Sequence, residues 1–255
     1  MQNSLTKKPG LNKSVLQLMA ILAMLIDHLS VFAPIPSIYF IMKFIGRASI
    51  VIMCYFIAEG YHKTHNIGKY IIRMAVFAAI SQIPFYLYLR WGKIPQDFMH
   101  LVYDMFRHRN VIFSLFVSLC LLTILKSNYK IIIKILAAFA ALCLANESDW
   151  GYFSILWVVG FGMLYGSKNK QMIWLLTVVL LRLAYTAIGP ISQIMQTQML
   201  TYGSLYSWLT GFGGFLPLAV LPFYNGEKGN MPKWIWYVFY PLQFIVIVAI
   251  IALVF

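Results

Sequence analysis

The chain alternates long apolar runs with short polar connections along its whole length. These runs are longer and more continuous than the ten-residue alternation of a membrane barrel, and they match helices that cross a bilayer. A helix bonds all of its backbone polar groups internally, as the interior of a membrane requires. We therefore predict an all-α, polytopic transmembrane helix bundle of about nine spans, near residues 15–33, 38–60, 69–89, 111–126, 130–146, 151–166, 171–189, 205–224 and 234–255.

The span count depends on one region. The fourth to sixth runs are short for a hydrocarbon core about 30 Å thick. Residues 190–224 are also compatible with a re-entrant element, which would leave eight spans.

A separate amphipathic helix is predicted near residues 96–109. Its apolar residues recur at helical spacing, and His100, Asp104 and His108 share another face. The segment is typical of a helix on the membrane surface or over the bundle. The polar face has a spacing that suits a metal, but a solvated face is favoured because no third strong ligand stands nearby. We expect no metal.

Composition indicates a single integral membrane domain over residues 1–255. Of these, 61% are hydrophobic and 11% are charged, whereas a soluble domain has about 25% charged residues. The net charge of +13 comes mostly from lysine and arginine at the ends of the apolar runs. No basic run with interleaved aromatics occurs, so we expect no nucleic-acid partner. The three isolated cysteines do not indicate a disulfide framework.

Lysine and arginine are unevenly distributed between alternate connections. They occur in the tail at 1–14 and in four later connections, whereas the connections at 34–37, 147–150 and 190–204 have none. The positive-inside rule then predicts a cytoplasmic N-terminal tail and an external C-terminus. The connection at 90–110 disagrees, because its four lysine and arginine residues fall outside.

Several ionisable side chains lie inside the predicted spans, where such groups are costly and usually functional. With the predicted orientation, they lie in the outer half of the membrane or near its middle. A histidine, a carboxylate and several cations in one cavity would suit anion binding and proton transfer. This set is Asp27, His28, Lys43, Arg47 and Arg182, with Asp149 at the outer surface.

Helix geometry separates Asp27 from His28. Side chains of adjacent helical residues point about 100° apart and do not face each other. We therefore expect Asp27 to contact Lys43 or Arg47 on the next span, while His28 faces the cavity. An ion pair that only fixes helix packing is an equal alternative for Asp27.

A second polar group is predicted near the cytoplasmic ends of the spans. Glu59 ends the second span, and Arg73 begins the third. Glu59 is expected to be a counter-ion for Lys63 or Arg73. A structural or snorkelling role is the favoured alternative to function for this group.

Short motifs, in order along nearly the whole chain, resemble those of the TraX-like membrane proteins. They are Met24-Leu25-Ile26-Asp27-His28, Gly46-Arg47, Ala58-Glu59-Gly60, Thr64-x-Asn66 with Tyr70 and Arg73, Ser81-Gln82-Ile83-Pro84, Asn110-Val111-Ile112-Phe113-Ser114-Leu115, Asp149-Trp150-Gly151 and Tyr224-Asn225-Gly226. Each motif alone is weak, and the ordered set is specific.

This resemblance implies acyl transfer in a bacterial inner membrane. The family is named for a protein that acetylates a conjugative pilin, and it is distantly similar to multi-spanning acyltransferases with an essential histidine. It implies an acetyl-CoA or related acyl-CoA donor, and an amine or hydroxyl acceptor on a pilin-like protein or surface glycan. Family motif positions in this chain are Asp27, His28, Arg47, Glu59, Arg73, Asn110 and Asp149.

Three positions depart from the family pattern. Gln243 stands where the family often has histidine, Gln82 where it often has glutamate, and Ser114 where it often has threonine. Gln243 can form hydrogen bonds but cannot carry a proton, so any chemistry of that histidine is altered or lost here.

The sequence therefore leads to an acyltransferase hypothesis in which His28, as general base, and Asp27 are the candidate catalytic residues. Lys43, Arg47 and Arg182 would bind anionic groups. The remaining candidate binding residues are Glu59, Arg73, Asn110 and Asp149. The alternative is a transporter, or an export or assembly factor for an anionic solute or a pilus component, although no inverted repeat is visible.

Overall fold

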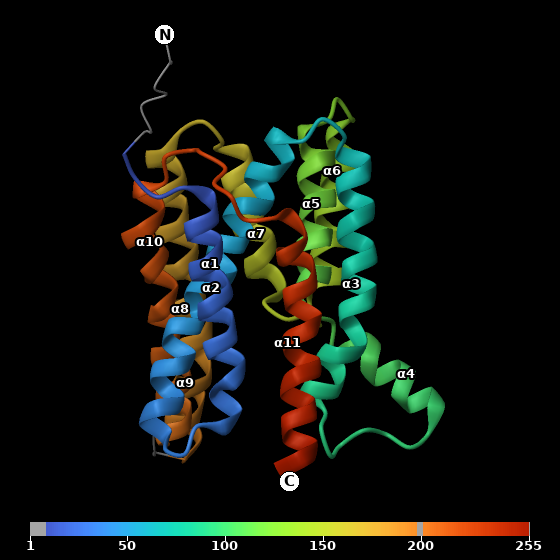
Figure 1. The fold of residues 1–255 in the computed structure, drawn as a ribbon, viewed down its shortest axis with the longest axis vertical. Helices are drawn as coiled ribbons and strands as arrows, with labels where there is room; N and C mark the ends of the chain where they lie inside the picture. The colour runs from blue at the N-terminus through green and yellow to red at the C-terminus, as the bar shows by residue number, and fades with distance from the viewer. Residues whose placement is uncertain (1–8, 198–200, 255) are drawn as a thin grey trace. The chain divides into compact units, whose positions relative to one another are not determined.

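The structure is a computed structural model that describes residues 9–197 and 201–254. These residues are predominantly helical, as the sequence predicts (Figure 1). The helices are α1 (Lys13–Leu29), η1 (Ser30–Phe32), α2 (Pro36–Lys63), α3 (Ile67–Leu89), α4 (Phe98–Arg107), α5 (Val111–Lys126), α6 (Ile131–Ala145), α7 (Gly151–Met163), α8 (Lys168–Thr197), α9 (Tyr202–Leu209), η2 (Thr210–Phe215), α10 (Leu216–Val220), η3 (Leu221–Phe223) and α11 (Lys233–Val254).

Helices occupy all nine predicted spans in the described part of the chain. Six helical runs there are long and apolar enough to cross a membrane. The predicted fourth to sixth spans are the shorter apolar helices α5, α6 and α7. The chain is therefore a multi-pass membrane protein.

Two spans differ in detail from the prediction. Helix α8 continues past the predicted end at residue 189 to Thr197, with Pro190 inside it, because membrane helices tolerate a proline whose freed carbonyl finds another partner. The predicted eighth span is not one α-helix: α9, η2, α10 and η3 follow one another instead. Glycines and prolines between residues 211 and 222 interrupt regular α-helical bonding there.

Local capping signals explain where several helices begin. In each case a short polar side chain precedes the helix and accepts a hydrogen bond from the backbone N–H three residues later, which satisfies one of the donors that the first turn leaves open. These N-cap residues are Asn12, Asn66, Asp97, Asn110 and Thr201.

The chain contains two compact units. The first comprises residues 1–53 and 179–232, and the second comprises residues 54–178 and 233–255. In the first unit, the segment before α1 pairs with the segment after η3: Leu11 N donates to Phe223 O at 2.8 Å, and Asn225 N donates to Leu11 O at 2.9 Å. The family motif at Tyr224-Asn225-Gly226 thus binds the segment just before α1.

In the second unit, α5 packs against α3, α6 and α7, and α3 also packs against α11. Aromatic rings fix the register of α3 and α11. The Phe77 and Tyr237 rings stack with centroids 4.5 Å apart, and Phe244 lies 5.5 Å from Phe85 and 5.0 Å from Tyr88. Residues later in α3 contact residues later in α11, so the two helices run in the same direction.

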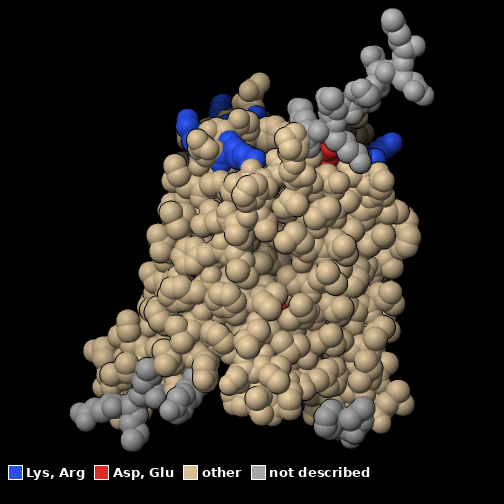
Figure 2. Space-filling view, turned by 60° about the vertical axis from the view of Figure 1, so that its left-hand side comes forward, with Lys and Arg blue, Asp and Glu red and all other residues tan. Residues whose placement is uncertain are grey.

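The surface is rich in exposed apolar side chains on the spanning helices. Uncharged residues make up nearly the whole face drawn in Figure 2, with lysine and arginine confined to small areas. Such a surface suits contact with lipid chains, where no charged group is readily accommodated.

Candidate functional site

Asp27, near the end of α1, forms an ion pair with Lys43 of α2. The Lys43 Nζ lies 3.1 Å from Asp27 Oδ2 and donates a second hydrogen bond, also of 3.1 Å, to the Asp27 main-chain oxygen. Only 16% of each side chain is exposed. The sequence predicted an interhelical cation as the partner of Asp27 rather than His28, and the structure confirms Lys43 in that position.

A glycine allows α1 and α2 to approach closely at this pair. A Cβ built on Gly46 would overlap the Asp27 side chain, including its Oδ1 atom. Oδ1 is buried, and none of the described residues donates a hydrogen bond to it. The Gly46-Arg47 motif therefore has a packing role at its glycine, because a side chain at residue 46 would displace the carboxylate.

Arg47 and Arg182 both adjoin the glycine-rich segment η2. A Cβ on Gly213 would collide with the Phe44 carbonyl oxygen and lie 3.1 Å from the Arg47 Cβ. A Cβ on Gly211 would lie 3.3 Å from a guanidinium nitrogen of Arg182. Because residues 211 and 213 are glycines, an arginine from α2 and another from α8 can both lie beside η2.

His28 lies in the same unit, one residue after Asp27. Its side chain is half-buried, and its Nδ1 atom is buried. Because adjacent helical side chains diverge by about 100°, the imidazole points away from the direction in which Asp27 meets Lys43. The unit therefore holds a titratable ring in an apolar helix, and a neutral imidazole can accept a proton near neutral pH.

The predicted inner group lies in the second unit. Glu59 is 4% exposed and pairs with Lys63 at 2.7 Å, one turn later on α2, which confirms one of its two predicted partners. Arg73 of α3 is exposed, with its guanidinium 5.7 Å from the centre of the Tyr70 ring. The Tyr70 hydroxyl lies against Gly60, where a Cβ would approach it to 2.8 Å. The Ala58-Glu59-Gly60 motif thus combines an ion pair with a close helix contact.

Asn110 links α3 to the start of α5 in the second unit and is completely buried. Its Nδ2 donates to Ala78 O and to Gln82 Oε1, each at 2.8 Å, and its Oδ1 caps α5 by accepting from Phe113 N at 3.1 Å. Both amide hydrogens are therefore occupied within the protein. Asn110 orients the start of α5, whereas the sequence placed it among the binding residues.

Gln82 extends this connection to α4. Its Nε2 donates to Met105 O at 3.1 Å and to His108 O at 2.8 Å, while Oε1 accepts from Asn110. A glutamate, which the family often has here, would supply no donor to these two carbonyl oxygens. In the sequence, Gln82 is only a departure from the family pattern; in the structure, its amide forms hydrogen bonds that a glutamate could not form.

Asp149 lies in a loop that is tied to the start of α5. Its N donates to Arg109 O at 2.8 Å, and its main-chain oxygen accepts from Ser114 Oγ at 3.1 Å. The next residue, Trp150, has φ +64°, a left-handed conformation that is uncommon for a bulky residue. The Asp149-Trp150-Gly151 motif therefore contains backbone strain, which concentrates at functional or tightly constrained positions. No feature of the sequence predicts this strain.

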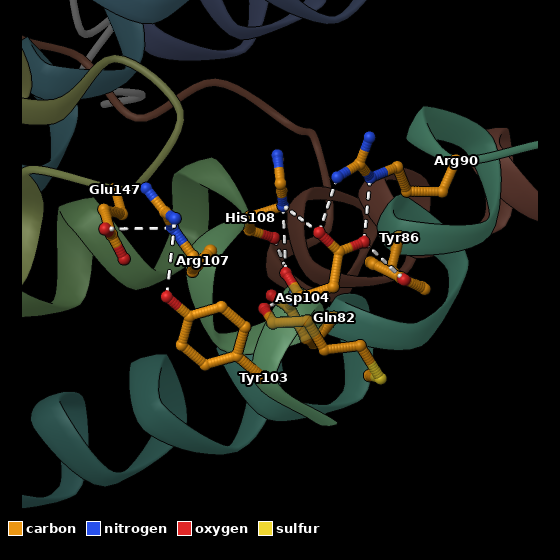
Figure 3. A network of polar contacts seen from close by, with 9 residues as sticks. Gln82, Tyr86, Arg90, Tyr103, Asp104, Arg107, His108 and Glu147 are labelled. Carbon is orange, nitrogen blue, oxygen red and sulfur yellow. Dashed lines mark hydrogen bonds and ion pairs between the residues drawn. The ribbon is translucent and has the colours of Figure 1, made fainter. Parts of the chain in front are cut away.

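The polar face of α4 divides into two parts, which corrects the predicted solvated face in part: Asp104 and His108 are directed inward, whereas the side chain of His100 is 80% exposed. Figure 3 shows Asp104 at the centre of a network that joins α4 to the end of α3. Arg90 donates from Nε to Oδ2 at 2.8 Å and from a terminal nitrogen to Oδ1 at 2.5 Å. Tyr86 donates to Oδ2 at 2.7 Å, and His108 Nδ1 lies 3.3 Å from Oδ1. The hydrogen bonds from Arg90 hold the pKa of Asp104 below its ordinary value.

These contacts also give a structural role to two of the four lysine and arginine residues in the connection at 90–110, which disagrees with the predicted orientation. Arg90 pairs with Asp104, and Arg107 lies 3.2 Å from Glu147. The sequence predicts that Asp104 and His108 share one face of this helix, but it does not predict the contacts of Asp104 with Arg90 and Tyr86. An arginine twenty residues or less from an acidic residue is too common a pattern to identify such a pair without knowing how the helices meet.

The structure places the candidate residues in two sets. Within the first unit, Asp27 and Lys43 are in direct contact, Arg47 and Arg182 share a neighbouring segment, and His28 adjoins Asp27. Within the second unit, Glu59 is near the end of α2 and Arg73 is near the start of α3. Asn110 and Asp149 belong to the connection around the start of α5. The first-unit set is the one with chemical capacity: a proton acceptor, a carboxylate and three cations.

Comparison with known proteins agrees with the motifs. A known relative from Dichelobacter nodosus, named probable fimbrial assembly protein FimC, serogroup H1, is 28% identical over 235 residues, which cover 89% of this chain and 91% of the relative. No solved structure matches the chain. Residues 12–251 match the family model described as TraX protein. Since this match spans nearly the entire chain, the protein belongs to the TraX family.

Proposed function

We propose that the protein is an acyltransferase embedded in the bacterial inner membrane. It would move an acetyl or similar group from a cytosolic acyl-CoA, with acetyl-CoA the simplest donor, to an amine or hydroxyl. The acceptor nitrogen or oxygen forms a bond to the thioester carbonyl carbon, the carbon–sulfur bond breaks, and the acceptor proton passes to a base. The free CoA thiol is the second product.

The observation that carries this proposal is the placement of His28. It is a half-buried imidazole on an apolar helix, next to a carboxylate whose Oδ2 is engaged by Lys43. His28 is therefore the general base in the proposal, since imidazole can take the acceptor proton at neutral pH and return it to the leaving thiolate. Asp27 is a positioning residue that holds α1 against α2.

The arginines give the proposal a means of binding anions. Arg47 and Arg182 adjoin one glycine-rich segment, and guanidinium groups form paired hydrogen bonds with phosphate and carboxylate. We assign them to a phosphate of the donor or to the oxyanion that develops as the thioester is attacked. Glu59 and Arg73 are assigned to the donor entrance on the cytoplasmic side, with the N-terminal tail in the cytoplasm.

The acceptor is proposed from the family and from one relative's name. The Dichelobacter nodosus relative is named as a fimbrial assembly protein, which favours a pilin-like protein over a surface glycan. The same name supports a second candidate: an assembly or export factor for pilus components that performs no acyl transfer. In that case the Asp27–Lys43 pair and the arginines would serve helix packing or passage of the component.

Purified protein in nanodiscs separates the two candidates. With acetyl-CoA, the acyltransferase should melt at a higher temperature and should release free CoA thiol when an acceptor peptide with a free N-terminal amine is added. Acetyl-pantetheine is the matched control, because it offers the same acyl thioester without the phosphates that Arg47 and Arg182 would bind. No stabilisation by acetyl-CoA and no thiol release with protein or glycan acceptors would leave the assembly factor as the function.

A further inference from the structure

Helix α4 exposes four of its apolar side chains and turns the charged Asp104 inward. Phe98, Met99, Tyr103 and Phe106 are each between 61% and 73% exposed. On a helix with about 100° per residue they occupy one continuous arc of about 140°. If this surface faced water, we would expect the fold to bury these four side chains, because burying each would stabilise it by about 1.5–3 kcal/mol.

The remaining residues of α4 divide into two further faces. Leu101, Asp104, Met105 and His108 are partly buried against the second unit, where Asp104 meets Arg90. His100 is 80% exposed and Arg107 is 50% exposed, and both lie between the apolar arc and the inward face. The side chains of α4 therefore form three distinct faces: one packed inward, one apolar and exposed, and a narrow polar one between them.

The orientation of α4 is fixed by strong contacts rather than by loose packing. Two nitrogens of Arg90 donate hydrogen bonds to the Asp104 carboxylate. Gln82 donates to the carbonyl oxygens of Met105 and His108. These bonds attach both the side chain and the backbone of α4 to the end of α3 (Figure 3). The exposed aromatic arc thus cannot rotate inward without breaking the network.

The neighbours of α4 in the chain limit what can cover this arc. The helix joins the end of α3 to the start of α5, and it lies at an angle to α3 in Figure 1. Since α3 is a candidate span and α5 is an apolar helix, α4 must lie where the chain turns at a membrane surface. At a membrane surface, lipid acyl chains can cover the apolar face, and the polar headgroups can contact His100 and Arg107.

We propose that α4 is an interfacial helix whose Phe98, Met99, Tyr103 and Phe106 side chains insert among the lipid acyl chains, with His100 and Arg107 at the headgroups. The two positions left open by the sequence, on the membrane surface or over the bundle, are thereby combined: one face touches lipid and the opposite face is anchored to the second unit. The lipid anchor keeps the connection around Gln82 and Asn110 at the membrane boundary.

Spin-label accessibility of the full chain tests this placement. In a background with alanine at Cys54, Cys120 and Cys143, labels are attached to Met99→Cys or Phe106→Cys, and the protein is placed in liposomes of phosphatidylcholine and phosphatidylglycerol. Collisions with oxygen, which concentrates in lipid chains, are compared with collisions with a water-soluble nickel chelate. Ile173→Cys, on the exposed surface of α8, is the lipid control, and Tyr129→Cys, in the α5–α6 connection, is the water control.

We expect labels at Met99 and Phe106 to give an oxygen-to-nickel ratio severalfold above that at Tyr129 and close to that at Ile173. A label at His100→Cys should give an intermediate ratio. Equal access of the nickel chelate at Met99 and Tyr129 would overturn the proposal, since the arc would face water. Exclusion of both reagents would overturn it as well, because another protein would then cover the arc. Phe98→Cys and Tyr103→Cys are replacements on the same face if one labelled variant does not fold.

Discussion

Replacing Asn110 by alanine removes three side-chain hydrogen bonds from the interior of the second unit. Loss of the N-cap bond to Phe113 N costs about 1 kcal/mol. The two amide donors are worth less than in a soluble core, about 0.6 kcal/mol each on average in membrane proteins. One of the two acceptors also keeps another donor, because Gln82 Oε1 still accepts from the backbone N–H of residue 110. Together these losses amount to about 2 kcal/mol of unfolding free energy.

The measurement is equilibrium unfolding in mixed micelles by titration with sodium dodecyl sulfate, followed by far-ultraviolet circular dichroism. Asn110→Ser is the matched variant, since its hydroxyl retains the cap and loses only the two amide donors, which predicts about half the loss of Asn110→Ala. Ser192→Ala is the control, because this exposed serine bonds only within its own helix. If Asn110→Ala unfolds within about 0.5 kcal/mol of the wild type, as an ordinary surface change does, the assigned role of this residue is refuted.

Three further changes probe single contacts. Gly46→Ala places a methyl group against the Asp27 side chain and should lower the unfolding free energy by about 1–3 kcal/mol; an unchanged value in the same titration would contradict the close approach of α1 and α2. Gln82→Glu puts an acceptor opposite two carbonyl oxygens and should cost about 1–3 kcal/mol at neutral pH, whereas a more stable variant would argue against the observed amide bonds. Because Arg90 holds the pKa of Asp104 below its ordinary value, this pair stabilises the fold above about pH 4 and its contribution should fall as pH drops through the lowered pKa; Arg90→Met should remove that part of the pH dependence, and an identical pH profile would contradict the pairing.

Apolar periodicity predicts the helices of this protein well, because membrane-spanning segments satisfy their backbone bonds locally. Periodicity does not predict where a helix ends when that end depends on contacts with other helices. Pro190 suggests that α8 stops, yet the helix continues to Thr197, since a proline costs one backbone bond and neighbouring groups can compensate for it. The eighth span is interrupted where its glycines meet side chains of α2 and α8, and those contacts are not visible along the chain.

The candidate site was predicted in part. The divergence of adjacent helical side chains separates Asp27 from His28, and it correctly directs Asp27 to a cation on the next helix. It does not choose between Lys43 and Arg47, which both lie on α2 one turn apart; the rotation and height of α2 beside α1 decide that. The sequence therefore identified the type of contact, and the packing selected its partner.

The hydrogen bonds around Asn110 could not be predicted from the sequence for a different reason. Asn110 before an apolar run is a recognisable capping signal, and it could have indicated a structural role. Its bonds to Ala78 and Gln82, however, depend on how α3 and α5 meet. The inward orientation of Asp104 depends in the same way on the position of Arg90 at the end of α3.

The role of His28 is tested most directly by transfer of radiolabelled acetyl from acetyl-CoA to an acceptor in proteoliposomes. The measurement compares the wild type with His28→Ala and with His65→Ala, which removes an exposed histidine from the α2–α3 connection. With His28 as general base, His28→Ala should lose about 100-fold or more of the transfer rate, while His65→Ala transfers at the wild-type rate and both variants keep the wild-type helix content. An unchanged transfer rate in folded His28→Ala would contradict the proposed mechanism.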